Sequence, residues 1–232
     1  MKGEYSVQVN IYCHEKCIRR LYAAAELIKR ELPEAELSCT VIFHEDSDGD
    51  LFPRNAHADE RAEPNKSAAE YNTENANVCS IRYISEAECR YVTETAYDES
   101  RAQYDAAYIL NDFERALAED KASRDESRKV PDSADDILNI LIVNENLYYP
   151  GYEFLYGAAY RLRALVSDHR IDTDENFKKE LFHELGHALG LKHCRRNCVM
   201  RPEGSRYGLD DKPMELCGAC RKKLRILKAS MN

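Results

Sequence analysis

The sequence predicts an α+β fold: a twisted mixed sheet, a backing helix, a helix that carries a histidine cluster, and a small irregular C-terminal lobe. Three observations predict it. Short segments near 5–12, 37–43 and 137–143 are rich in apolar or β-branched residues, as strands are. Residues 173–189 repeat apolar side chains at helical spacing. Beyond them, four cysteines occur in two pairs, a pattern typical of a small unit held by a metal or by disulfides.

Each element can be placed in chain order from its apolar pattern and its boundaries. The first strand alternates apolar and polar residues, and the helix after it ends before Pro33. Polar, charged stretches at 44–77 and 118–136 predict an insertion and a linker. The expected elements are a strand at 5–12, a helix at 16–32, a strand at 37–43, an interrupted strand at 79–95, a helix at 98–118, a central strand at 137–143 and an edge segment at 148–167.

Length and composition favour one domain over residues 1–232. With 232 residues, 44% of them hydrophobic, the chain can bury a full core. We expect an N-terminal lobe at 1–190 and a C-terminal lobe at 191–232. The first residues lack the apolar region of a signal peptide, and no run approaches the roughly 18 apolar residues of a membrane helix. Nine cysteines, an odd number with metal-ligand patterns among them, predict a reducing, cytoplasmic compartment.

The most informative motif is HExxHxxGxxH, which begins at His183 and ends at His193. On a helix, His183 and His187 lie one turn apart on the same face, so both imidazoles can reach one metal ion. Gly190 can adopt the left-handed conformation that ends a helix, after which His193 can supply a third ligand. A catalytic zinc ion requires three protein ligands and an open position. Glu184 is placed to act as the general base for its water.

The helix that carries this motif is well marked. Thr173 or Asp174 can cap its first turn. The alternative is an amphipathic core helix whose histidines are only polar surface groups. That interpretation predicts neither Gly190 nor His193, so a zinc site is favoured. The apolar positions at helical spacing are Phe177, Leu181, Leu185 and Leu189.

Four cysteines follow the histidine motif with spacings CxxxC and CxxC. Such pairs fit a structural zinc ion bound by four thiolates. Free buried thiols or two disulfides are the alternatives. A further pair, Cys13 and Cys17, has no second pair nearby in the sequence and is interpreted as structural. The four candidate ligands are Cys194, Cys198, Cys217 and Cys220.

From His183 to Cys220 the chain resembles the archaemetzincins, a family of metzincin zinc peptidases. Their signature joins the histidine motif to a Cys directly after the third His, a second Cys, a Met two residues on and a distant CxxC. A looser similarity covers 147–157. The loops from Cys194 to Cys198 and from Met200 to Cys217 are each one residue shorter than in that signature. Zinc sites tolerate such variation in ligand spacing, so we expect the cysteine site to form.

The resemblance implies a zincin-type α/β/α sandwich and a zinc-dependent peptide-bond hydrolase with two zinc ions per chain. The histidines would bind the catalytic zinc, with Glu184 as general base, and the four cysteines the structural zinc. Met200 would form the Met-turn beneath the histidines, although an ordinary core Met is the alternative. Residues 154–159 would line the upper rim of a cleft for a peptide substrate. Tyr207 is a weaker candidate for stabilising an oxyanion.

Two other classes of function compete with a peptidase of aminopeptidase-like or endopeptidase action. One is a non-catalytic adaptor that keeps zinc for stability. The other is a nucleic-acid-binding module built from the cysteine pairs and the basic C-terminal region. The net charge of -9 argues against broad phosphate contact, so no nucleic acid partner and no membrane partner are expected. The sequence does not predict the oligomeric state.

Overall fold

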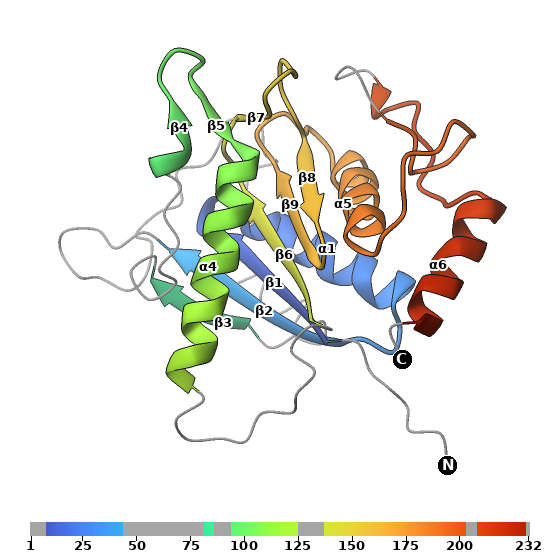
Figure 1. The fold of residues 1–232 in the computed structure, drawn as a ribbon, viewed down its shortest axis with the longest axis horizontal. Coiled ribbons are helices and arrows are strands. Elements are labelled where there is room, and N and C mark those ends of the chain that lie inside the picture. Colours follow the sequence, from blue (N-terminus) through green and yellow to red (C-terminus); the bar gives the residue numbers. More distant parts are fainter. Residues whose placement is uncertain (1–7, 44–80, 86–93, 125–136, 203–207, 231–232) are drawn as a thin grey trace, which may run out of the picture.

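A six-stranded mixed sheet forms the centre of the fold (Figure 1). The computed structural model describes residues 8–43, 81–85, 94–124, 137–202 and 208–230, so the expectations for 44–77 and Tyr207 lie outside the described residues. The strand order is β3-β2-β1-β6-β9-β8, and only β8 runs antiparallel to its neighbour. The strands are β1 (Gln8–His14), β2 (Glu36–Phe43), β3 (Ile81–Ser85), β6 (Leu138–Val143), β8 (Gly157–Tyr160) and β9 (Arg163–Ser167).

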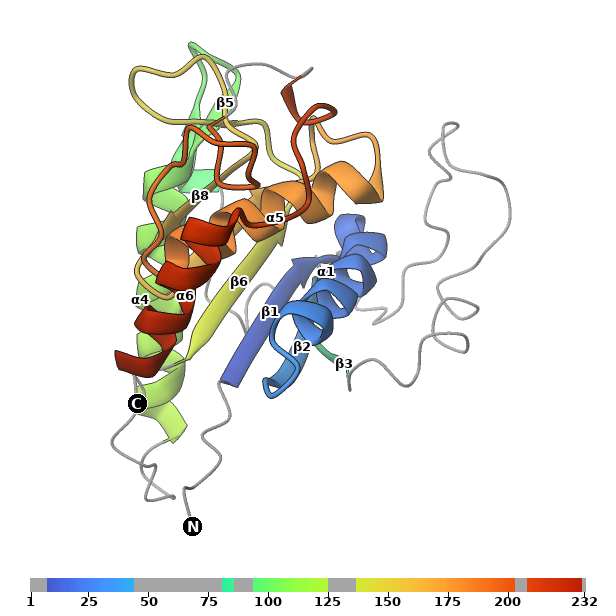
Figure 2. The same cartoon turned by 90° about the vertical axis from the view of Figure 1, so that its right-hand side faces the viewer.

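Helices cover both faces of this sheet, which confirms the predicted α/β/α arrangement (Figure 2). The backing helix α1 (Ile18–Glu31) and α5 (Asp174–Ala188) pack on one face, and α4 (Ala106–Arg124) packs on the other. The central strand β6 alternates between the two layers: Ile140 and Ile142 face α1 and α5, whereas Leu141 faces α4. Because both faces are covered, β6 is apolar throughout its buried part.

A second, three-stranded sheet lies beside the first and alters one predicted boundary. It consists of β4 (Tyr97–Asp98), β5 (Gln103–Asp105) and β7 (Leu147–Tyr148), and a 3-10 turn at Glu94–Ala96 precedes it. The helix expected from residue 98 therefore begins only at Ala106. The Asp105 carboxylate accepts hydrogen bonds from the backbone N–H groups of Ala107 (2.9 Å) and Tyr108 (3.2 Å), as a helix cap does.

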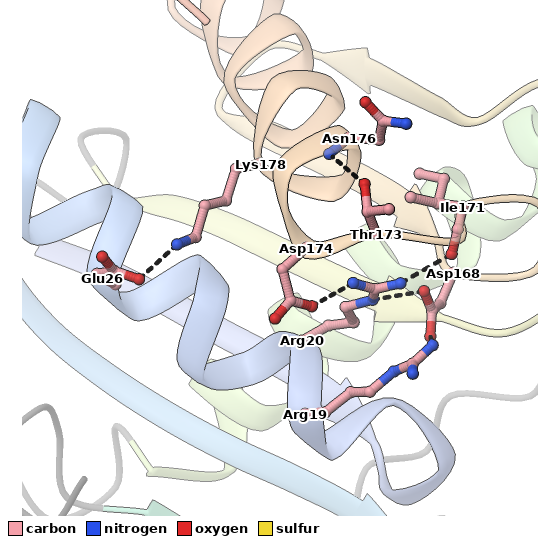
Figure 3. Close-up of polar contacts among 9 residues, drawn as sticks. All are labelled: Arg19, Arg20, Glu26, Asp168, Ile171, Thr173, Asp174, Asn176 and Lys178. Atoms are coloured by element: carbon pink, nitrogen blue, oxygen red, sulfur yellow. Dashed lines mark hydrogen bonds and ion pairs between the residues drawn. The ribbon is translucent and has the colours of Figure 1, made fainter. Parts of the chain in front are cut away.

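The start of α5 is fixed to α1 by a buried arginine (Figure 3). Arg20 is 1% exposed; its Nε lies 2.6 Å from Asp168 Oδ1, and its Nη2 donates to the Ile171 carbonyl at 2.8 Å. Nη1 pairs with Asp174, the first residue of α5. The predicted cap is confirmed, since Thr173 Oγ1 accepts from the Asn176 backbone N–H at 3.1 Å. These contacts determine where α5 begins relative to the sheet.

The C-terminal segment packs against α5 instead of extending the sheet. Residues 191–202 and 208–217 are irregular, and the basic helix α6 (Gly218–Ser230) follows. Val199, Met200 and Leu209 belong to the same apolar cluster as α1, α5 and the sheet. The division into lobes at residue 190 stays a prediction. In the described part of the chain, no helix is both long and apolar enough to cross a membrane.

The cysteines of β1 and the turn after it lie in the core. Cys13 and Cys17 are completely buried, and burial raises the pKa of each thiol well above its usual range. A protonated thiol is a poor nucleophile. Neither residue joins a metal-ligand cluster among the described residues. Both findings agree with the structural role predicted for this pair.

Candidate metal centre and catalytic site

The histidines of the motif converge at the C-terminal end of α5. Gly190 has φ +89°, the left-handed conformation predicted for it, and its N–H donates to the His187 carbonyl at 2.9 Å. The chain then returns along the helix end, which brings His193 toward the other two rings. The ring centroids of His187 and His193 lie 4.7 Å apart. One nitrogen of each of the three histidines lies within 4.8 Å of the others.

Backbone carbonyls determine which ring nitrogens are available to a metal. His183 Nδ1 lies 2.8 Å from the Val199 carbonyl, and His187 Nδ1 lies 2.9 Å from the Leu191 carbonyl. A carbonyl only accepts hydrogen bonds, so both Nδ1 atoms donate and each neutral ring keeps a lone pair on Nε2. The two Nε2 atoms face each other at 3.1 Å. Two lone pairs this close repel unless a cation lies between them, and tetrahedral zinc separates its nitrogen ligands by about 3.3 Å. The histidines therefore fit a zinc ion.

Electrostatics keeps these imidazoles neutral. Burial, with a smaller contribution from the Lys212 ammonium, lowers the pKa of His183 to about 3. Burial also lowers the pKa of His187 and of His193. Metal ligation requires the neutral ring. At neutral pH a zinc ion would therefore meet three free lone pairs and displace no proton from these rings.

Glu184 lies beside the histidines in a tightly packed position. It is 5% exposed, and its side chain lies against Gly157 at the start of β8. Burial raises the pKa of the Glu184 carboxyl well above its usual range, the neighbouring Glu180 raises it further, and Lys212 opposes both. Sequence reasoning missed Glu180 and Lys212. The available signal for Glu180 was its position one turn before Glu184 on the same helix face.

Gly157 provides the space that Glu184 occupies, which makes a testable prediction. A Cβ at this position would lie 2.7 Å from the Leu165 carbonyl oxygen of β9 and 2.8 Å from Glu184 Cγ. We expect Gly157→Ala to displace the Glu184 side chain or the edge strand, at a cost of about 1–3 kcal/mol in the free energy of unfolding. Zinc content should not change, because Gly157 contacts none of the histidines in this way. Urea unfolding and metal analysis of the purified variant measure both quantities.

Gly218→Ala is the matched control for this prediction. A Cβ at Gly218 meets no atom within 4 Å, and its φ lies outside the left-handed region. The control should therefore unfold like the wild type. If Gly157→Ala also unfolds like the wild type, the proposed close packing of Glu184 against β8 is wrong.

The four cysteines predicted as ligands lie together beside the histidines. Their sulfur atoms all lie within 4.8 Å of one another, and the Sγ atoms of Cys194 and Cys217 are 3.8 Å apart. That separation is too long for a disulfide bond but matches the roughly 3.8 Å between sulfur ligands of a tetrahedral zinc ion. A backbone hydrogen bond at Cys220 lowers the pKa of the Cys217 thiol to about 6, whereas burial raises the pKa of the Cys198 and Cys220 thiols. The Cys217 thiolate is thus available at neutral pH, and a zinc ion would displace the protons of Cys198 and Cys220 on binding.

Met200 lies directly beneath the histidine helix. It is completely buried, and a Cβ added to Gly186 would meet its Sδ atom. Gly186 lies between His183 and His187, so only a residue without a side chain lets Met200 approach the helix so closely. The Met200 carbonyl accepts a hydrogen bond from the Cys194 N–H at 2.8 Å. The Met-turn role of Met200 stays a prediction.

The predicted upper rim, residues 154–159, includes the start of the edge strand β8. The edge strand β8 lies at the end of the sheet and packs beside α5, as expected for the upper rim. It begins at Gly157, not at Phe154, because Leu155 pairs with Leu147 of β7 and the pairing with β9 starts only at Gly157.

Comparison with known proteins agrees with this geometry. The sequence model described as Peptidase family M54 matches residues 89–226, more than half of the chain. The archaemetzincin of Nanoarchaeum equitans is 41% identical over 90 residues, which cover 38% of this chain and 53% of that protein. The archaemetzincin of Halobacterium salinarum is 31% identical over 162 residues, which cover 62% of this chain and 82% of that protein.

Solved structures show the same fold at low sequence identity. The crystal structure of archaemetzincin from Archaeoglobus fulgidus, complexed with malonate, has a TM-score of 0.58 and 22% identity and covers 93% of this chain and 99% of that one. The archaemetzincin of Methanopyrus kandleri has a TM-score of 0.59 and 21% identity, with 99% and 98% covered. Together with the family match, these similarities confirm the resemblance read from the motifs: the chain belongs to peptidase family M54 and is a zinc metallopeptidase of that family.

Proposed function

We propose that this chain hydrolyses peptide bonds with a zinc ion held by His183, His187 and His193, and that a second, structural zinc is held by the four cysteines. One observation carries the proposal. The Nδ1 atoms of two histidines are both committed to backbone carbonyls, which leaves two Nε2 lone pairs facing each other at 3.1 Å. Only a cation makes that arrangement favourable. Glu184, which directly follows His183 in the sequence, supplies a carboxyl group for the reaction.

The proposed reaction assigns both proton transfers to Glu184. Zinc in this site would polarise the substrate carbonyl and acidify the attacking water. Glu184 accepts a proton from that water at a carboxylate oxygen and later donates it to the leaving amine nitrogen. The Lys212 ammonium favours the ionised form of Glu184 that accepts the proton, and burial raises the Glu184 pKa, so the carboxyl group can hold the proton between the two transfers.

The edge strand β8 supports an extended peptide as the substrate. Among the described strands, β8 pairs with β9 alone, and its other edge ends the six-stranded sheet. An extended peptide can add to such an edge through main-chain hydrogen bonds. Since α5 packs beside β8, the bound peptide would lie along the histidines. Thiolate ligands for the second zinc require reduced cysteines, whereas Cys39 of β2 is disulfide-bonded. The cytoplasmic location stays a prediction.

Digestion of a defined peptide library by the zinc-loaded protein tests this function. Half of the peptides should carry a free N-terminus and half an acetylated one, so that aminopeptidase and endopeptidase action are separated. Cleavage that a zinc chelator stops, and that added zinc restores, supports the proposal. No cleavage by protein with full zinc at the histidines would instead favour the non-catalytic adaptor.

The cysteine site should also stabilise the histidine site. Val199 provides the carbonyl that orients His183, and its own N–H donates to the Glu215 carbonyl at 2.8 Å, between the two cysteine pairs. Cys194 directly follows His193. Groups that orient ligands typically change metal affinity about 10- to 100-fold. Cys217→Ser should therefore weaken zinc binding at the histidines by this factor as well as at the cysteines.

Native mass spectrometry and competitive chelator titration measure this coupling. The wild type should carry two zinc ions, and Cys217→Ser should lose the cysteine-bound ion and release the second to weaker chelators. Cys17→Ala is the control, because it alters a buried cysteine outside both clusters and should keep two ions. Unchanged affinity at the histidines of Cys217→Ser would show that the two sites are independent.

A further inference from the structure

Glu184 has a partner that the zinc motif does not predict. Its carboxyl group forms a side-chain hydrogen bond with Glu180, which lies one turn earlier on α5. Each of the two residues is 5% exposed. This contact, between two buried side chains one turn apart on α5, limits the directions in which the Glu184 carboxyl can point.

Lys212 approaches Glu180 from the C-terminal segment. Its Nζ lies 3.7 Å from Glu180 Oε2, and Lys212 is only 2% exposed. Burying both charges is costly, and removing one partner leaves the other uncompensated. The ammonium group therefore restricts Glu180 to positions near it, and the restriction passes to Glu184 through the carboxyl–carboxyl hydrogen bond.

The turn that carries Lys212 is itself fixed to α5. Lys179 Nζ donates to the carbonyls of Leu209 and Asp210, each at 3.2 Å. Asn176 Nδ2 donates to Asp210 Oδ1 at 2.6 Å. Asn176 and Lys179 of α5 thus bind the turn, while the Lys212 side chain on the same turn is buried. Glu180 and Lys212 consequently meet at a defined place beside Glu184.

We propose that Glu180 and Lys212 are positioning residues for peptide hydrolysis: Lys212 holds Glu180, and Glu180 holds the Glu184 carboxyl in the direction of the attacking water. The inference rests on the proposed function of Glu184 as general base. It predicts an effect on kcat more than on KM, since neither Glu180 nor Lys212 is exposed to substrate. A purely structural tie between the turn and α5 would instead change stability and leave kcat of the folded enzyme intact.

Two double variants separate these roles while avoiding a lone buried charge. Glu180→Gln with Lys212→Met and Glu180→Leu with Lys212→Met both remove the ion pair. Only the first keeps a group that can hydrogen-bond Glu184. The pair with Leu should show a kcat roughly 10- to 100-fold below the wild type, with KM and zinc content unchanged. The double variant with Gln should have a kcat between those of the wild type and of the double variant with Leu, because its amide is no longer held by an ammonium group.

Lys178→Met is the matched control. Lys178 lies on the same helix, but its Nζ pairs with Glu26 of α1 at 2.5 Å, away from the histidines. This variant should keep the wild-type kcat. Thermal unfolding of all variants identifies any that fail to fold, and kcat is then expressed per zinc-loaded, folded chain.

A second measurement does not depend on peptide hydrolysis. Acetohydroxamate binds an active-site metal and hydrogen-bonds to the general base, so its affinity reports the position of Glu184. Its dissociation constant is measured from the visible absorption of the cobalt-substituted protein. The Leu pair should bind the probe about tenfold more weakly than the Gln pair. Equal affinity and equal kcat in the two pairs would overturn the proposal. A wild type that binds the probe but cleaves no peptide would refute the proposed function, and the affinity ratio would still decide the positioning role.

Discussion

Replacing Glu184 by Gln should abolish detectable peptide hydrolysis while two zinc ions stay bound. The amide has the same shape as the carboxyl group but cannot accept a proton from water. Loss of a general base typically costs about 10²–10⁴-fold in rate. Glu184→Gln should not unfold the chain, because the amide can still donate a hydrogen bond to Glu180. We expect a thermal midpoint at or above that of the wild type.

Initial rates on a cleaved library peptide, with zinc content measured on the same sample, test this expectation. Glu175→Gln is the control, since Glu175 lies in the exposed first turn of α5 and pairs there with Lys179. It should keep the wild-type rate. A Glu184→Gln protein that hydrolyses peptide at a comparable rate would show that another group accepts the proton.

Arg20→Met should lower the free energy of unfolding by about 3–5 kcal/mol. Arg20 lies on α1, and its buried side chain forms ion pairs with Asp168 and Asp174 and donates a hydrogen bond to the Ile171 carbonyl. Methionine fills a similar volume but leaves the Asp168 carboxylate, which is 7% exposed in its side chain, without its main counter-charge. The loop between β9 and α5 and the first turn of α5 would both lose their attachment to α1 (Figure 3).

Urea unfolding, monitored by circular dichroism, measures this change in the free energy of unfolding. Arg19→Met is the matched control: the Arg19 side chain is 45% exposed and pairs with the same Asp168 at 3.3 Å. An exposed pair contributes at most about 1 kcal/mol. If the two substitutions have equal effects, the buried network does not anchor α5. Adding Asp168→Asn to Arg20→Met should recover part of the loss, because it removes the unpaired charge.

Local patterns were sufficient for most of the elements that carry the site. Thr173, Gly190 and the apolar spacing between them predicted α5, since caps and helical periodicity are properties of neighbouring residues. The histidine and cysteine clusters were also predictable, because the residues of each occur in a short, spaced motif. The start of α4 could not be predicted from the sequence, because Asp98 and Asp105 are both suitable helix caps. Only the pairing of β5 with β4 and β7 selects Asp105.

The contacts around Glu184 could not be predicted from the sequence. Glu180 and Lys212 are common surface residue types, and the segment between them is irregular in its described parts. Their meeting depends on how the turn at Leu209 packs on α5, which is a tertiary property. The close approach of Gly157 to Glu184 depends in the same way on strand pairing.

The position of the cysteine pairs in the chain has a consequence for biosynthesis. The ribosome makes the sheet and α5 first, and the residues that support the histidines, from Val199 to Cys220, emerge afterwards. Because domains fold as their segments become available during translation, a nascent chain can form its core before it can retain the metal. Full zinc affinity at the histidines would then arise only in molecules whose synthesis has passed Cys220. Fragments released by premature termination before that residue would bind zinc more weakly at the histidines.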